Sequence, residues 1–188
     1  MSGFPRLLVV TDADLAPSSR GAGRTLLNIL SGWPAQDVRI LSTLAGSAGE
    51  TIHGHRVFDA GGRVRGGIVE RLRPYIGDVQ AQYNAFRPLD TAFLEQFTPE
   101  VVLVVPTSVH SLVIGARWAK WFPVPSATWL MDDWVQQYPT RWITGSSEGT
   151  ARALLKRNGG WLVISEYLGE ELRRWTSLER SRFVVHNA

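Results

Sequence analysis

Short apolar runs alternate with longer amphipathic stretches along this chain. Residues 101–105 (VVLVV) and 161–164 (WLVI) are apolar throughout, which is typical of strands covered on both faces of a parallel sheet. The other strand candidates are short runs rich in β-branched residues, at 6–11, 38–43, 51–58, 126–131 and 183–186. The pattern predicts about seven strands.

The stretches between these runs carry apolar residues at helical spacing, as the leucines at 26, 27 and 30 illustrate. Helices are predicted at 24–33, 67–76, 88–98, 111–122, 149–158 and 166–176. Ser165 is placed to cap the last of them. The alternation predicts a single α/β domain with a doubly wound, mostly parallel, Rossmann-like sheet and helices on both faces. Between residues 59 and 87, the glycine-rich run predicts a mobile loop.

Composition narrows the class of protein. The chain has 188 residues and no cysteine, which excludes a disulfide framework and thiolate metal chemistry and favours a cytoplasmic location. No signal peptide and no membrane-spanning apolar run is apparent. The net charge of +3 is too small to require nucleic acid. It suits an anionic ligand and leaves peripheral contact with the inner face of a membrane open.

The loop after the first strand predicts a phosphate site. Gly21, Ala22 and Gly23 stand just before a helix, where backbone N–H groups face an anion. A dinucleotide fingerprint is excluded because position 26, where a third glycine is needed, holds leucine. A Walker loop is excluded because no Gly-Lys-Ser/Thr follows. The Asp12-Ala13-Asp14 pattern is interpreted as ordinary loop chemistry, so no metal site is predicted.

Two carboxylates and two indoles stand at the end of the fifth predicted strand. They are Asp132, Asp133, Trp129 and Trp134, and they come where a doubly wound sheet opens into its ligand crevice. Carboxylates hold sugar hydroxyls, and indole faces stack on sugar rings. In the alternative interpretation Asp133 caps a turn and the tryptophans are core. His110, at a predicted helix start, either reaches the same crevice or is structural.

A basic cluster is also present, and its role is open. It either faces an anionic acceptor or lipid headgroups, or is a solvated surface. Its members are Arg63, Arg65, Arg71 and Arg73, with His53 and His55 nearby.

Five segments, taken in order, carry a family resemblance. They are 19–28 (SRGAGRTLLN), 99–104 (PEVVLV), 130–134 (LMDDW), 162–166 (LVISE) and 182–187 (RFVVHN). In this order they resemble the N-terminal Rossmann-like domain of GT-B retaining glycosyltransferases of family 4. The resemblance covers almost the whole chain, so residues 1–188 are interpreted as that acceptor-side domain.

The resemblance implies transfer of a sugar from a nucleotide-diphosphate donor to a sugar or lipid-linked acceptor, with retention and without metal or other cofactor. Amides around Gly21, Ala22 and Gly23 would hold the donor diphosphate. Asp132 and Asp133 would lie beside the reacting groups as catalytic residues. The acceptor would contact His110, Trp134 and Arg24.

Two departures qualify the resemblance. Residues 126–134 contain no histidine, although many relatives place one there. The donor-binding C-terminal domain is absent, so the isolated chain is expected to be inactive, because transfer needs both walls of the cleft. Two other hypotheses stay open. One is a non-catalytic binding or assembly module, which the eight tryptophans suggest; the other is half of a sugar-nucleotide epimerase of the same architecture.

Overall fold

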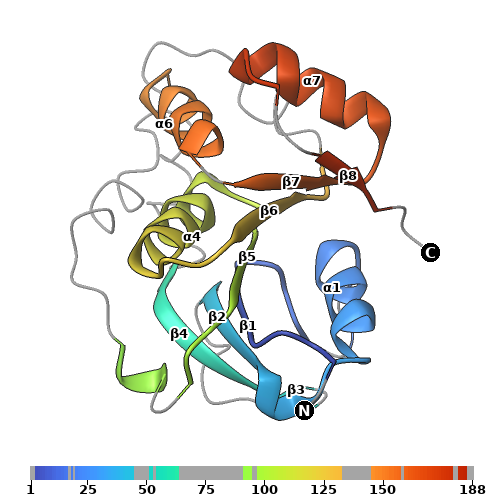
Figure 1. Ribbon diagram of the computed structural model, residues 1–188, viewed down its shortest axis with the longest axis vertical. Helices are drawn as coiled ribbons and strands as arrows, with labels where there is room; N and C mark the ends of the chain where they lie inside the picture. The colour runs from blue at the N-terminus through green and yellow to red at the C-terminus, as the bar shows by residue number, and fades with distance from the viewer. Residues whose placement is uncertain are drawn as a thin grey trace.

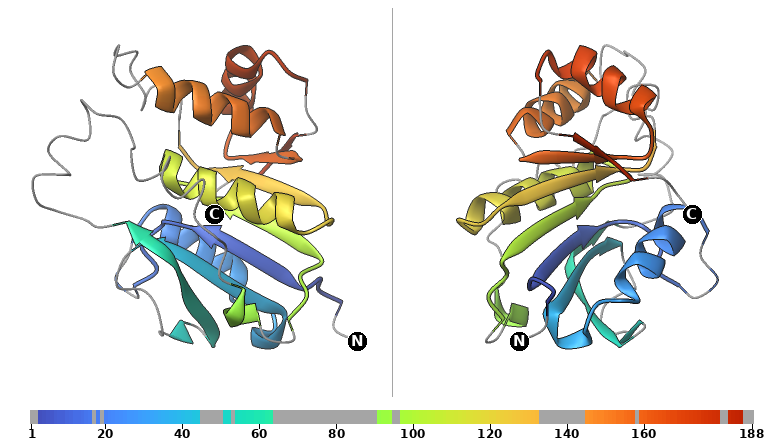
Figure 2. Two further views of the ribbon diagram at one scale, coloured as in Figure 1. Left: turned by 90° about the vertical axis from the view of Figure 1, so that its left-hand side faces the viewer. Right: turned by 45° about the vertical axis from the view of Figure 1, so that its right-hand side comes forward.

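An eight-stranded sheet with helices on both faces forms the protein (Figures 1 and 2). The computed structural model describes residues 3–16, 18, 20–44, 51–52, 54–63, 91–94, 97–132, 145–157, 159–179 and 182–185. The predicted class, a single Rossmann-like α/β domain with a mostly parallel sheet, is confirmed. None of the helices in these ranges is long and apolar enough to cross a membrane.

The strands follow one another across the sheet in the order β3-β4-β2-β1-β5-β6-β7-β8. They span Leu7–Thr11 (β1), Val38–Leu44 (β2), Thr51–Ile52 (β3), His55–Arg63 (β4), Val101–Val105 (β5), Ser126–Leu130 (β6), Gly160–Val163 (β7) and Arg182–Val184 (β8). The pairing is parallel except between β3 and β4. Parallel pairing brings the carboxyl ends of seven strands to one edge, called here the carboxyl edge; the opposite edge is the amino edge.

The strand order reverses beside β1. From β1 the chain moves outward through β2 to β4, and it then returns to the other side of β1 with β5. Leu7 pairs with both Val38 and Val101. Doubly wound sheets bind their ligands at such a switch point, beyond the carboxyl ends of the two strands.

Helices cover the two faces unequally. They span Ala22–Leu30 (α1), Val109–Trp121 (α4), Gly145–Arg157 (α6) and Glu166–Thr176 (α7), with 3-10 turns at Ala35–Asp37 (η1) and Ala92–Leu94 (η2). One core cluster joins α4, α6 and α7 to their face of the sheet, and the other packs α1 against the opposite face. In Figure 1, α4 and α1 accordingly flank the central strands from opposite sides.

Three predicted elements differ from the structure. The predicted strand 51–58 is a hairpin of β3 and β4, because Gly54 takes φ 83° in the turn, a backbone conformation that favours glycine. β4 then continues through Arg63, into the predicted loop. Of the predicted helix 88–98, residues 91–94 and 97–98 are described, and the helical part among them is a 3-10 turn at Ala92–Leu94. The predicted helix 67–76 lies outside the described residues.

Candidate functional site

Asp12 links the residues that follow β1 to the loop that follows β5, at the carboxyl edge of the switch point. It follows β1 directly and is only 2% exposed. Its Oδ1 accepts the backbone N–H of Thr107 at 2.6 Å, and its Oδ2 accepts the hydroxyl of Ser108. Both donors belong to the loop between β5 and α4. Hydrogen bonds to a carboxylate are charge-assisted and stronger than neutral ones, so one buried side chain ties the two central strands together at this edge.

The same network fills the N-terminus of α4. Ser108 is the N-cap residue, and its hydroxyl oxygen accepts the N–H of Ser111 at 3.4 Å. The Asp12 carboxylate therefore lies where the helix dipole and the first backbone N–H groups favour an anion. The protein's own carboxylate takes this position, so α4 offers no open anion site at its start.

The two carboxylates of the Asp12-Ala13-Asp14 pattern accept hydrogen bonds from different loops. Asp12 is buried, whereas Asp14 is exposed, and its Oδ1 accepts the N–H of Ala16 at 3.0 Å. These contacts agree with the interpretation of the pattern as loop chemistry. No cluster of three or more potential metal ligands occurs within the described ranges.

The N-terminus of α1 is the open one. Gly21 is its N-cap, with φ 65° and ψ −135°. No side chain accepts a capping hydrogen bond there, and the first turn of α1 contains no acidic residue. This backbone conformation requires glycine. Gly21 is exposed, and a Cβ added there would meet nothing within 4 Å. The helix start that the sequence predicted as a phosphate site therefore presents accessible backbone.

α7 provides a useful contrast at the same edge. Its N-cap Ser165 accepts the N–H of Leu168 at 3.2 Å, and Glu166 lies in its first turn. The predicted cap at Ser165 is confirmed. Among α1, α4 and α7, whose N-caps are described, α1 alone starts without a capping side chain.

The other predicted site residues are placed only in part. Asp132 is exposed, two residues beyond β6. β5 lies between β1 and β6. The carboxyl ends of β1 and β6 are therefore two inter-strand spacings apart, which is about 10 Å. Arg24 is exposed on α1, and His110 is in the first turn of α4. Asp133 and Trp134 lie outside the described residues, so their predicted roles stay predictions.

Trp129 and His55 belong to the interior. The Trp129 side chain is 2% exposed in the core cluster beneath α1, as the core interpretation of the tryptophans expected for this residue. His55 is 1% exposed, and its Nε2 lies 3.0 Å from the carbonyl oxygen of Leu30. His55 is therefore not part of an exposed basic face. The side chains of Arg63, Arg65, Arg71, Arg73 and His53 lie outside the described residues.

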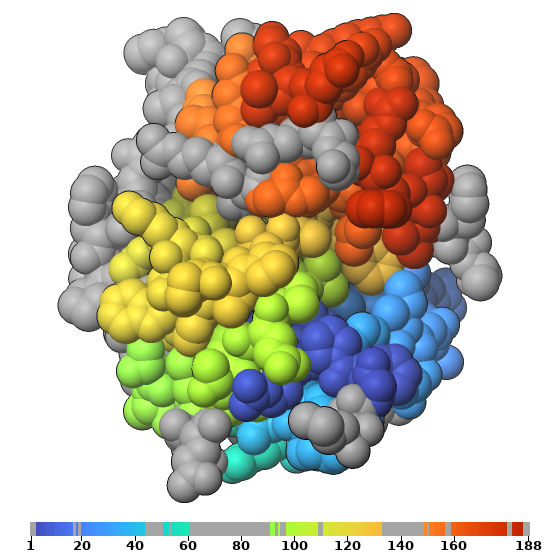
Figure 3. Space-filling model, in the orientation of Figure 1, coloured from blue at the N-terminus to red at the C-terminus, as the bar shows by residue number. Residues whose placement is uncertain are grey.

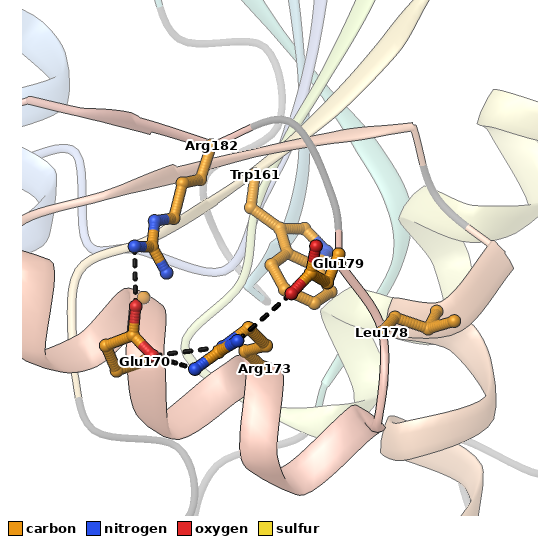
Figure 4. Close-up of a pocket in the computed structure, with 7 residues that line it drawn as sticks. Trp161, Glu170, Arg173, Leu178, Glu179 and Arg182 are labelled. Atoms are coloured by element: carbon orange, nitrogen blue, oxygen red, sulfur yellow. Dashed lines mark hydrogen bonds and ion pairs between the residues drawn. The ribbon is translucent and has the colours of Figure 1, made fainter.

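A pocket of about 220 Å³ lies between α7 and β8 (Figure 4). Arg182 reaches Glu170 at 2.6 Å, and Arg173 reaches Glu170 at 2.8 Å and Glu179 at 3.1 Å. The indole of Trp161 lines the same pocket but is 1% exposed. The charged side chains that line this pocket pair with one another. These ion pairs form a brace that joins α7 to the edge strand β8.

Comparison with known proteins supports the fold. No protein-family model and no curated protein matches the sequence. The structure is similar to that of HepE from Anabaena in complex with UDP and glucose, with TM-score 0.58, 14% identity and coverage of 98% of this chain and 45% of that chain. It is also similar to sucrose-phosphate synthase from Thermosynechococcus elongatus, with TM-score 0.62, 14% identity and coverage of 96% and 47%.

The described domain therefore has the fold of part of each of these neighbours. At 14% identity the likeness establishes the fold and leaves activity to be argued from the site. This chain spans less than half the length of either neighbour.

Proposed function

We propose that this chain is the acceptor-side domain of a retaining glycosyltransferase of family 4, which uses a nucleotide-diphosphate sugar as donor. The observation that carries the proposal is the open start of α1 at Gly21, beside the switch point of a fold shared with a protein crystallised with UDP and glucose. The N–H groups there would hold the donor's diphosphate and stabilise the charge on the leaving nucleotide.

The acceptor is proposed to bind between α1 and the residues after β6. Asp132 is exposed there, and with Asp133 it would contact sugar hydroxyls next to the reacting centre. Arg24, His110 and Trp134 would complete the acceptor contacts. No metal or other cofactor is proposed. A separate donor-binding domain would close the cleft and orient the reactants, so the domain alone is proposed to bind without transferring sugar.

Binding of UDP to this chain tests the phosphate site directly. Ala22→Glu places a carboxylate in the first turn of α1, where it suits the helix dipole and repels a diphosphate. Asn28→Glu adds the same charge farther along α1, at an exposed position. Titration followed by NMR should show affinity about tenfold lower for Ala22→Glu than for the wild type, and little change for Asn28→Glu. Equal affinity of the two variants contradicts the assignment of the site.

Transfer is tested separately from binding. We expect no sugar transfer by this chain alone, and transfer with retention by a longer protein that adds a donor-binding domain. Asp132→Asn in that longer protein should lower kcat by at least about a hundredfold while UDP affinity is kept. No transfer by either protein, across common donors and acceptors, argues for a non-catalytic binding module.

A further inference from the structure

The turn between α4 and β6 is an exposed apolar segment. Residues 121–125 read Trp-Phe-Pro-Val-Pro, and none of the five is buried. Trp121 is 60% exposed, and both prolines are exposed. Single exposed apolar side chains are ordinary, but a contiguous apolar surface marks a contact site. This segment, here called the apolar turn, has no part in the proposed sugar site.

The apolar turn has a firm base. Phe122 stacks on Trp118 with ring centroids 5.9 Å apart, and Val124 packs partly against the core. The carbonyl of Pro125 accepts the N–H of Val102 at 3.0 Å. Two side chains of the turn thus point inward and hold it, which leaves the indole of Trp121 to project from a fixed backbone.

The apolar turn lies at the amino edge, opposite the candidate sugar site, because it leads directly into β6. In the left view of Figure 2 the yellow turn reaches the same end of the sheet as the N-terminus. Figure 3 views this edge, and the yellow segment forms part of its surface.

Positive charge gathers on the two helices beside the turn. α4 and α6, which are neighbours on one face of the sheet (Figure 1), contain five basic residues and one acidic residue. This excess of four exceeds the net charge of the whole chain, which is +3. The only lysines of the sequence, Lys120 and Lys156, are both exposed. Each lies in the last turn of its helix, which brings both to the amino edge.

We propose that the apolar turn, with Lys120 and Lys156, binds the surface of an anionic lipid bilayer. Tryptophan is favoured in the headgroup layer of membranes, and lysines near the surface attract anionic lipids. Among the described residues of the same edge, two acidic side chains are paired with arginines: Glu100 with Arg6 at 3.8 Å and Glu179 with Arg173 at 3.1 Å. The carboxyl edge faces away from the bilayer in this arrangement, so membrane binding does not depend on the proposed function.

Co-sedimentation with vesicles tests the proposal on the full chain. Binding should be strong to phosphatidylcholine vesicles that contain phosphatidylglycerol and weak to phosphatidylcholine alone. We expect Trp121→Ser to lower the partition coefficient about tenfold and Lys120→Gln about fivefold. The matched controls are Tyr167→Ser, at a side chain 63% exposed, and Arg20→Gln. Both lie at the carboxyl edge, and both should bind like the wild type.

Labelling of amines gives a second, independent measurement. An amine-reactive reagent modifies Lys120, Lys156 and the N-terminus, and anionic vesicles should protect both lysines. Absence of binding, equal binding to neutral vesicles, or an equal loss in the control variants overturns the proposal. So does binding to soluble polyglutamate with the same dependence on Trp121 and Lys120, which would identify an acidic protein as the partner.

Discussion

Asp12 combines burial, charge and two hydrogen bonds to one loop, so its substitution affects the whole carboxyl edge. Asp12→Asn keeps the shape but replaces one acceptor oxygen with a donor that faces another donor. We expect the free energy of unfolding to fall by about 2 kcal/mol. Asp14→Asn, at an exposed carboxylate, should change it by no more than about 0.5 kcal/mol. Urea denaturation of both variants measures this, and equal effects contradict the assigned role of Asp12.

Glu170 is the carboxylate whose titration best reports on the brace between α7 and β8. The hydrogen bond from Arg182 is the main cause that holds the pKa of Glu170 below its ordinary value, and Arg173 adds to the effect. Because the folded pKa is lowered, the stabilisation is present above the unfolded carboxyl pKa of about 4.3. It is lost as the pH falls through the folded pKa.

NMR titration of the Glu170 carboxyl tests this linkage. In Arg182→Gln the pKa should rise toward its ordinary value. In Arg174→Gln it should stay where it is in the wild type, because Arg174 pairs with Glu171 instead. An unchanged pKa in Arg182→Gln would show that the ion pair does not form in solution.

α4 packs closely against β5 at Gly115. A Cβ at that position would lie 2.2 Å from Cγ1 of Val104, so Gly115→Ala overpacks the interface. We expect a loss of about 2 kcal/mol in unfolding free energy. Gly149→Ala in α6 meets nothing within 4 Å and should instead stabilise by about 0.5 kcal/mol, since alanine favours helix. Thermal unfolding distinguishes the two, and the same sign for both contradicts the packing argument.

β8 is a short strand, so its pairing with β7 depends on the ion pair between Arg182 and Glu170. It spans Arg182–Val184, and among the described strands it pairs with β7 alone; Phe183 is 66% exposed. Arg182→Gln should therefore raise hydrogen exchange at the Val185 amide, which bonds the Val163 carbonyl at 2.7 Å, by about fivefold. Arg174→Gln should leave that exchange rate unchanged. Equal rates in all three proteins would show that the apolar contacts of β8 suffice.

Elements with strong local patterns could be predicted from the sequence. The bounds of β5 and of α7 match the prediction, because an unbroken apolar run and a helix with its own cap are both defined locally. The hairpin at 51–58 was missed, because β-branched residues lie on both sides of Gly54 and only the turn at this glycine divides the run. Gly21 and Asp132 follow strands that end at one edge of the sheet, because β1, β5 and β6 are parallel.

The network around Asp12 could not be predicted in this way. Asp12 and Ser108 are 96 positions apart, and their contact depends on β5 lying next to β1. No local sequence pattern indicates that β5 lies next to β1. An acidic residue directly after a buried strand, and a serine before a helix, were each visible, but nothing in the sequence joins them.

The position of β1 has a consequence for biosynthesis. Of the strands of this sheet β1 is made first, yet one of its two neighbours, β5, begins at Val101, so β1 must wait for a partner synthesised much later. At translation rates of about 5–20 residues per second, the nascent polypeptide exposes an unpaired apolar edge for roughly 5 to 20 s. Ribosome-bound chains that end before Val101 should therefore recruit holdase chaperones, and chains that extend past β6 should release them.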